Sequence, residues 1–233
     1  MTRILAVVTV LASALVLGVG TAGATDECRG LNPCVPVAGP WVIVPVAKTL
    51  PRPRVEFQVR CPRGYVVGGL DAELSDRAID LTFTGKLGAP VNPGITTERA
   101  AVFTGMYVGL GARAPSFRPH LGCLPASGGG GIPTLAAVVP PGKPTVRHVK
   151  EVPLFGARLA RVTVACTPGE RLVAAAHAVG FWTSLPPTPA QAARVTATRS
   201  VRNGRIVVRV RTGALGNARA LLQVSAVCAG GGQ

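Results

Sequence analysis

The chain has 233 residues, six cysteines and a formal net charge of +15, from 25 basic and 10 acidic side chains. Beyond residue 24 no segment is apolar over enough length to span a bilayer, so we expect no transmembrane segment in the mature chain. Six cysteines without a Cys-x-x-Cys pattern indicate disulfides rather than catalytic thiols or a zinc site, and we predict neither a metal nor a cofactor.

The positive charge is distributed unevenly along the chain. Residues 25–135 carry 11 basic and 8 acidic side chains, whereas residues 136–233 carry 13 and 2. This asymmetry favours an acidic partner or surface for the second half. Arginine also outnumbers lysine by 21 to 4, which is typical of a GC-rich coding genome, so part of the charge has a compositional origin.

Residues 1–24 have the pattern of a secretory signal peptide. Arg3 provides a positive start, an apolar run follows it, and Ala22-Gly23-Ala24 is a small-x-small cleavage site. We therefore expect cleavage before Thr25 and a protein that is secreted, extracellular or associated with the cell envelope. An uncleaved membrane anchor is the alternative.

Four of the six cysteines recur with one spacing. The pairs Cys61–Cys123 and Cys166–Cys228 each span 62 positions, and a shift of 105 positions superimposes one pair on the other. The spacing thus indicates an internal repeat, in which each of two copies of one unit is closed by its own disulfide. Among the fifteen pairings that six cysteines allow, the repeat favours these two, and Cys28–Cys34 follows by exclusion.

The expected strands are short β-branched or alternating runs between Gly and Pro turns. In the first repeat they are residues 41–46, 55–60, 65–67, 79–83, 100–108 and 117–123, and Pro45 places the first of them at a sheet edge. In the second repeat they are residues 146–152, 159–166, 171–179, 194–202, 205–212 and 220–228. The only helix-like stretch is 190–193.

We predict an all-β protein with two tandem disulfide-stapled, β-sandwich-like repeats after a cleaved signal peptide. Strand topology, and whether the repeats share one core, stay open. The predicted segments are a signal peptide (1–24), an N-terminal disulfide loop (25–35), a first β repeat (36–123), a Gly/Pro-rich linker (124–140), a second β repeat (141–228) and a tail (229–233).

The clearest local feature is a hairpin at residues 194–211. Asn203-Gly204 predicts a type I′ turn, which sets Arg202 opposite Arg205. Alternation then gathers arginines on one face and apolar side chains on the other, with Arg199 intruding among the latter. The candidate anion-binding residues are Arg194, Arg202, Arg205, Arg209 and Arg211.

Two interpretations of this hairpin remain. One is a patch for a polyanion, such as an acidic cell-envelope polymer or an acidic lipid surface. The other, which charge runs usually favour, is a solvated outer face on an edge hairpin. Nucleic acid is disfavoured because no aromatic residue is interleaved for base stacking. The adjacent aromatic pair Phe181-Trp182 is better explained by core packing.

Other candidate chemistry is weak. The acidic cluster of Asp71, Glu73, Asp76 and Asp80 lacks the spacing of a calcium loop, so we expect a solvated loop or an internal contact with arginines of the second repeat. His177 lies in an alanine-rich strand and is expected to be a satisfied core residue. No His-Glu-x-x-His or Gly-x-Ser-x-Gly motif is present, so we predict no enzyme.

Several motifs support a resemblance: Cys28-Arg-Gly-Leu-Asn-Pro-Cys34, Val37-Ala-Gly-Pro-Trp-Val42, and Cys61-Pro-x-Gly64 followed by Val66-Val-Gly-Gly69. On these motifs the chain resembles uncharacterised secreted actinobacterial proteins with a duplicated Cys-Pro-x-Gly β repeat. The resemblance covers most of the first half, implies export and an actinobacterial source, and transfers no active site. The second repeat departs from the pattern, with Thr167-Pro168-Gly169 and Ala174-Ala175 at the matching positions.

Together these observations predict a secreted or envelope-associated, non-catalytic β module that binds an anionic surface or polymer through the arginine hairpin. A structural or protein-interaction module, such as an inhibitor of a secreted enzyme, is the alternative. A secreted hydrolase is the least favoured, since it would need a triad assembled from distant residues. The expected partners are an acidic envelope polymer, an acidic lipid surface or a secreted protein.

Overall fold

A computed structural model describes residues 25–85, 99–111, 114–126 and 145–230. The expected signal peptide and most of the expected linker lie outside these residues. Within them nearly every element is a strand, one short helix is present and three disulfides form, which confirms the all-β prediction. No helix in the described ranges is long and apolar enough to cross a membrane.

The first half contributes seven strands in two layers. β1 (Val35–Ala38) and β2 (Trp41–Ile43) follow one another along one edge of β7 (Ser116–Pro125), and β4 (Tyr65–Leu74) pairs with the other edge. The second layer is a three-stranded sheet in the order β3 (Arg54–Arg60), β6 (Ala100–Tyr107) and β5 (Ile79–Gly85).

The second half uses the same pairing order. β8 (Thr145–Leu154), β13 (Arg219–Gly230) and β10 (Glu170–Trp182) form one layer. β9 (Arg158–Ala165), β12 (Arg205–Thr212) and β11 (Val195–Arg202) form the other. The short helix α1 (Pro189–Ala192) connects β10 to β11 and begins with a capping box at Thr188.

The long strands β4 and β10 share a detail of register. The register shifts between Val67 and Gly69 in β4, and between Leu172 and Ala174 in β10, 105 positions further along the chain. The strand expected at 65–67 stops at the two glycines, Gly68 and Gly69, which interrupt the β-branched run. In the structure β4 passes through them with a bulge and continues to Leu74.

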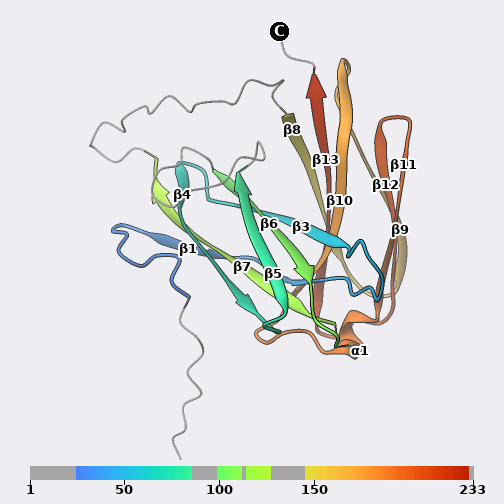
Figure 1. Ribbon diagram of the computed structural model, residues 1–233, viewed down its shortest axis with the longest axis horizontal. Coiled ribbons are helices and arrows are strands. Elements are labelled where there is room, and N and C mark those ends of the chain that lie inside the picture. The colour runs from blue at the N-terminus through green and yellow to red at the C-terminus, as the bar shows by residue number, and fades with distance from the viewer. Residues whose placement is uncertain (1–24, 86–98, 112–113, 127–144, 231–233) are drawn as a thin grey trace, which may run out of the picture.

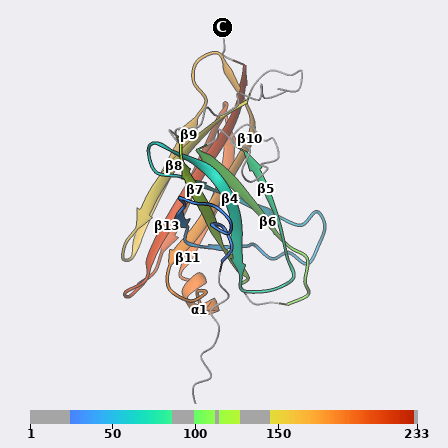
Figure 2. The same cartoon turned by 90° about the vertical axis from the view of Figure 1, so that its left-hand side faces the viewer.

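One continuous sheet joins the halves, because β2 pairs with β10 through Trp41 opposite Phe181 and Val42 opposite Gly180. Figure 1 shows the first half on the left and the second half on the right, and Figure 2 looks onto the first half. The predicted edge position of the strand before Pro45 is wrong. This strand ends at Ile43, so the missing N–H of Pro45 interrupts no pairing, and β2 lies between β7 and β10.

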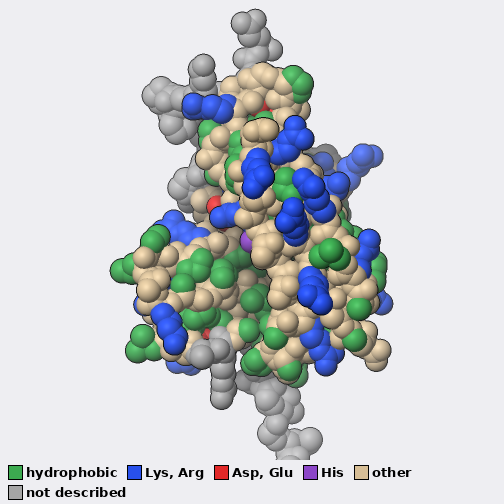
Figure 3. Space-filling model, turned by 90° about the vertical axis from the view of Figure 1, so that its right-hand side faces the viewer, with side chains coloured by type: hydrophobic (Ala, Val, Ile, Leu, Met, Phe, Trp, Pro, Cys, Tyr) green, Lys and Arg blue, Asp and Glu red, His purple; other side chains and the backbone are tan. Residues whose placement is uncertain are grey.

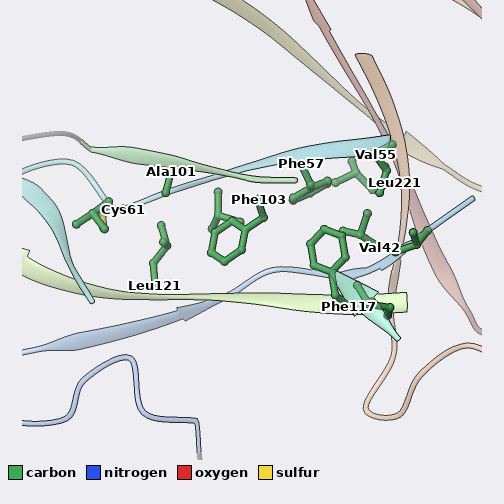
Figure 4. Packing of buried hydrophobic residues seen from close by; sticks show 14 of the residues in the cluster. Val42, Val55, Phe57, Cys61, Ala101, Phe103, Phe117, Leu121 and Leu221 are labelled. Atoms are coloured by element: carbon green, nitrogen blue, oxygen red, sulfur yellow. The ribbon is translucent and has the colours of Figure 1, made fainter. Parts of the chain in front are cut away.

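Two hydrophobic cores form, and they meet at the junction. The first lies between the layers of the first half, and Figure 4 labels residues of it from both layers: Val42, Val55, Phe57, Cys61, Ala101, Phe103, Phe117, Leu121 and Leu221. Leu221 comes from β13, so the second half closes this core at one end. The second core contains Ile206, Val208 and Leu222.

The two cores explain why β13 is apolar along almost its whole length. Leu222 and Val224 point into the second core, whereas Leu221 belongs to the first. A strand that is buried on both faces loses the usual alternation of apolar and polar side chains. Its two buried polar residues, Gln223 and Ser225, hydrogen-bond to partners at the junction.

All three predicted disulfides form. Cys61–Cys123 connects the end of β3 to β7, and Cys166–Cys228 connects the end of β9 to β13, so each bridge staples the two layers of its own half. Cys28–Cys34 closes the N-terminal loop. Disulfides of this kind are typical of proteins in an oxidising, extracellular environment.

Candidate anion-binding site

The arginine hairpin has the predicted geometry. Asn203 and Gly204 both have positive φ, at 48° and 69°, as a type I′ turn requires. Arg202 lies opposite Arg205, and Thr198 lies opposite Arg209. Along β12, the alternate residues Ile206, Val208 and Val210 are buried in the second core. On the opposite face, Arg205, Arg209 and Arg211 are exposed. Burial of the apolar face therefore orients the arginines toward solvent.

A third strand enlarges this face. β9 pairs with the free edge of β12 and sets Arg161 directly opposite Arg209. Directly opposed residues have Cβ atoms only about 5 Å apart, so two rows of paired arginines form, Arg202 with Arg205 and Arg209 with Arg161. The rows lie four residues apart on β12, or about 13 Å. We name the outer surface of β9, β12 and β11 the arginine face.

Arg161 was missed from the sequence. Its own strand alternates clearly, because Val162 and Val164 are buried and Arg161 and Thr163 are exposed. Alternation alone therefore assigns Arg161 to the outer face. Its position beside Arg209 depends on the pairing of β9 with β12, which connects segments about forty residues apart and has no short-range signal.

The arginine face contains a shallow, open hollow of about 410 Å³. Val207 is only 6% exposed and is the apolar residue of the lining. The other lining residues are all basic or neutral polar: Arg161, Thr198, Arg199, Ser200, Arg202, Asn203, Arg205 and Arg209. Figure 3 shows many Lys and Arg side chains, and very few acidic ones, on the side of the molecule that carries β9, β11 and β12.

The two remaining predicted arginines are placed differently. Arg211 is exposed on the same face, two residues beyond Arg209 and outside the hollow. Arg194 precedes β11, roughly 26 Å along the strand from Arg202. Its Nη1 donates a hydrogen bond to the Ala214 carbonyl at 2.6 Å, which ties it to the loop after β12. The structure therefore gathers Arg202, Arg205 and Arg209, extends the face with Arg211, and separates Arg194.

Arg199, the charged residue on the apolar side of β11, has a structural role. Its Nη1 donates a hydrogen bond to the backbone carbonyl of Ala175 in β10. β11 is the edge strand of its sheet, so a long side chain there can reach across to the neighbouring layer while keeping its charged end at the surface.

The chemistry of the arginine face favours anions. A guanidinium group presents a planar fork of donors that matches phosphate, sulfate or carboxylate oxygens. The two arginines of each row lie directly opposite one another and repel, and a bound anion relieves this repulsion. Among the described residues, no salt bridge involves Arg161, Arg202, Arg205 or Arg209, so their donors are available to a ligand.

Three members of the acidic cluster are engaged within the first half, and the fourth, Asp80, is exposed. Asp71 accepts a hydrogen bond from the Asp26 N–H at 2.6 Å, and Asp76 accepts one from the Tyr107 hydroxyl at 3.1 Å. Glu73 pairs with His120 at 2.8 Å. The predicted internal contact with arginines of the second half involves a different carboxylate, because Arg147 pairs with Glu56 at 2.6 Å.

Two histidines have glutamate partners. His120 is buried between Glu73 and Glu27, and His148 Nε2 lies 2.9 Å from Glu170 Oε2. Hydrogen bonds from Thr167, and then the contact with His148, lower the pKa of Glu170. Cys228 lies close to this second pair, but its sulfur is bonded to Cys166 and is not available as a metal ligand.

His177 is not the satisfied core residue that its sequence context suggests. It is half-buried, and its Nδ1 is buried without a hydrogen-bond partner among the described residues. Burial lowers the pKa of His177, and the nearby charge of Arg199 lowers it further, against a weaker opposite effect of a hydrogen bond to the Ala197 backbone. The imidazole therefore remains neutral at neutral pH.

The Phe181-Trp182 pair is divided between core and surface. Phe181 is fully buried, as expected, but Trp182 is 47% exposed because successive residues of a strand point to opposite faces. Trp182 shares a hollow of about 350 Å³ with Phe155, which is 61% exposed, and with Arg219. The core explanation thus holds for Phe181 only.

Comparisons with known proteins assign no family to the chain. Function must therefore be inferred from the residues themselves, and the arginine face is the arrangement with the clearest chemical preference. No protein-family model, curated protein or solved structure matches the chain significantly.

Proposed function

We propose that this protein is a secreted or envelope-associated, non-catalytic β module that binds an anionic polymer or surface through the arginine face. The observation that carries the proposal is the double row of exposed arginines around a hollow whose lining includes no carboxylate. The three disulfides support an extracellular location, because such bonds persist in oxidising compartments.

A polymer or charged surface suits this face better than a single small anion. The hollow is shallow and open, so an isolated ion would remain largely hydrated and weakly held. Individual exposed ion pairs contribute only about 0.2–1 kcal/mol, and useful affinity requires several of them at once. Rows of arginine about 13 Å apart can contact separate charges along one extended polyanion.

The neutral side chains between the arginines agree with this proposal. Thr196, Thr198 and Ser200 are exposed on the outer side of β11 and offer hydroxyl groups to phosphate or sugar oxygens. Nucleic acid is the less favoured polymer, because the outward positions of β9, β11 and β12 include no aromatic residue for base stacking.

The test is binding of the oxidised protein without residues 1–24 to linear polyphosphate and to phosphatidylglycerol vesicles across a salt series. The variant Arg161→Ser, Arg202→Ser, Arg205→Ser, Arg209→Ser removes the four arginines of the two rows. We expect wild-type binding that weakens steeply with salt, and at least a tenfold loss in the variant, since exposed charge interactions are screened.

The matched control removes four exposed arginines from the first half instead: Arg60→Ser, Arg63→Ser, Arg77→Ser and Arg99→Ser. Both variants lose the same formal charge. Equal weakening in the two variants would mean that net charge alone drives binding, and negligible binding by the wild type would leave the arginine face as a solvated surface. Either result contradicts the proposal.

A protein-interaction role is the second candidate, and the hollow beside Trp182 and Phe155 favours it. Exposed aromatic residues beside an arginine have the composition of binding hot spots. Here we expect Trp182→Ser to abolish co-purification of one secreted protein while leaving polyanion binding unchanged. If Trp182→Ser retains every protein that co-purifies with the wild type, the second candidate is contradicted.

A further inference from the structure

A half-open cavity of about 370 Å³ lies at the junction of the two halves. One side is lined by Ile43 and Pro45 and by residues 53–55, and β10, α1 and β11 line the other. Most of the lining side chains are small and apolar, among them Val55, Val179 and Val195. The volume is at the lower end of the range of small-molecule sites, and a mainly apolar lining with few polar groups is typical of them.

The polar groups of the cavity are all basic or neutral. Arg54 and Arg199 line it together with His177, and no carboxylate does. Arg54 forms no salt bridge within the described residues, and Arg199 uses one guanidinium nitrogen for the Ala175 carbonyl, which leaves its other donors free. The buried Nδ1 of His177 has no described partner, so a polar ligand group that reached it would satisfy it.

From these contacts we infer that the junction cavity binds a small anionic amphiphile, in which one carboxylate, sulfonate or phosphate group is attached to a compact apolar body. The anionic group pairs with Arg54 and Arg199, and the apolar body packs against the valines. This ligand class differs from that of the arginine face, whose hollow is lined by two rows of arginines and a single apolar side chain. Arg199 lines both sites.

The position of the cavity gives the ligand a further effect. Its walls come from both halves, so a ligand that fills it contacts residues of β3 and β11, which belong to different sheets. A ligand that binds only the folded state stabilises that state by mass action. We therefore expect bound amphiphile to raise the melting temperature of the oxidised protein.

The probe for the test is 8-anilinonaphthalene-1-sulfonate, whose fluorescence reports entry into an apolar site, and N-phenyl-1-naphthylamine is its uncharged counterpart. We expect saturable binding of the sulfonate, with one molecule per chain and weaker binding of the uncharged probe. Arg54→Gln and Arg199→Gln should each weaken sulfonate binding about tenfold and leave the uncharged probe unaffected, since each removes a charge-assisted hydrogen bond.

A filling variant and two controls locate the site. Ala192→Trp places a large side chain into the cavity from α1, whereas Ala193→Trp alters the exposed neighbour that does not line it. We expect the first to abolish binding of both probes and the second to have no effect. Arg161→Gln with Arg209→Gln, on the arginine face, should leave sulfonate binding unchanged.

Three results would overturn the inference. They are the absence of saturable sulfonate binding, binding that survives both Arg54→Gln and Ala192→Trp, and binding that falls equally in the arginine-face variant. Arg54→Gln remains informative even if Arg199→Gln fails to fold, because the Arg54 side chain forms no salt bridge within the described residues. Loss of polyanion binding at the arginine face would not affect this test.

Discussion

Gln223 of β13 and Gln58 of β3 hydrogen-bond reciprocally across the junction. The Gln58 N–H donates to Gln223 Oε1 at 2.7 Å, and Gln223 Nε2 donates to the Gln58 carbonyl at 2.9 Å. Both residues are nearly inaccessible to solvent: Gln58 is 3% exposed and Gln223 is 2% exposed. One side chain thus satisfies both backbone groups of a residue in the other half, which fixes the register of the two halves.

This contact predicts a strong asymmetry between two similar substitutions. Gln223→Leu preserves side-chain volume but leaves a buried N–H and a buried C=O of Gln58 without partners. We expect it to lower the free energy of unfolding by about 2–4 kcal/mol. Gln58→Leu should be neutral or slightly stabilising, because the side-chain oxygen and nitrogen of Gln58 have no partner among the described residues.

Urea unfolding of both variants, followed by circular dichroism, measures the difference. Equal destabilisation by the two substitutions would show that the reciprocal hydrogen bonds are not what holds the junction. The m-value provides a further check, since loss of docking between the halves would separate one transition into two.

The disulfides predict a second ranking of stability. Cys61–Cys123 and Cys166–Cys228 each close loops of 62 positions, whereas Cys28–Cys34 closes one of six. In the chain-entropy model the long loops are worth about 4 kcal/mol each and the short loop about 2 kcal/mol. Paired Cys→Ala variants in thermal unfolding should follow this order. A larger loss from the short loop would contradict it.

His177 predicts a pH dependence of stability. The pKa of His177 in the folded protein is lowered, mainly by burial, from its ordinary value of 6.5. Below pH 6.5 the unfolded chain therefore binds more protons at this site than the folded one, so stability falls as the pH drops, until the folded pKa is reached. The stability that this neutral histidine provides is fully present above pH 6.5.

Substitution of this histidine isolates its contribution. His177→Gln should reduce the loss of unfolding free energy between roughly pH 8 and pH 5, relative to wild type. The difference of the two pH profiles removes the contributions of the other titrating groups. If the pH profiles of wild type and His177→Gln are parallel, His177 has the same pKa in the folded and unfolded states, and the prediction is wrong.

The close approach of the N-terminal loop to the main sheet predicts a local effect. A Cβ at Gly122 would lie 1.9 Å from the Glu27 carbonyl oxygen, so Gly122→Ala must displace the loop. We expect faster hydrogen exchange and proteolysis at residues 25–34, with smaller effects elsewhere. Gly213→Ala is the control, because its nearest neighbour would be 3.8 Å away. Unchanged protection of the loop in Gly122→Ala would contradict the expectation.

Local chemistry made part of this structure predictable. Asn203-Gly204 determines the hairpin register because only a few residues accept two consecutive positive φ values, and the register then places Arg202 beside Arg205. The disulfides followed from the spacing of the cysteines. The twelve expected strands overlap observed ones, because burial on one face imposes alternation along strands such as β9 and β12, and strands buried on both faces, such as β13, read as continuous apolar runs.

Contacts between distant segments were not predictable in the same way. Arg161 joins Arg209 only through the pairing of β9 with β12, and Gln223 meets Gln58 only when the two halves dock. The interior position of β2 depends on the strand ending before Pro45, which its β-branched sequence does not reveal. Trp182 is exposed because its neighbour Phe181 occupies the core, and residue type alone does not distinguish the two.

The most direct test of the arginine face is a map of where a polyanion binds. Isotope-labelled protein in the oxidised form is titrated with linear polyphosphate, and amide and arginine side-chain NMR shifts are followed. We predict that the saturable shifts concentrate on β9, β11 and β12, around Arg161, Arg202, Arg205 and Arg209, and decrease as salt is added. Shifts concentrated in the first half, or around Trp182 and Phe155, would contradict the proposed function.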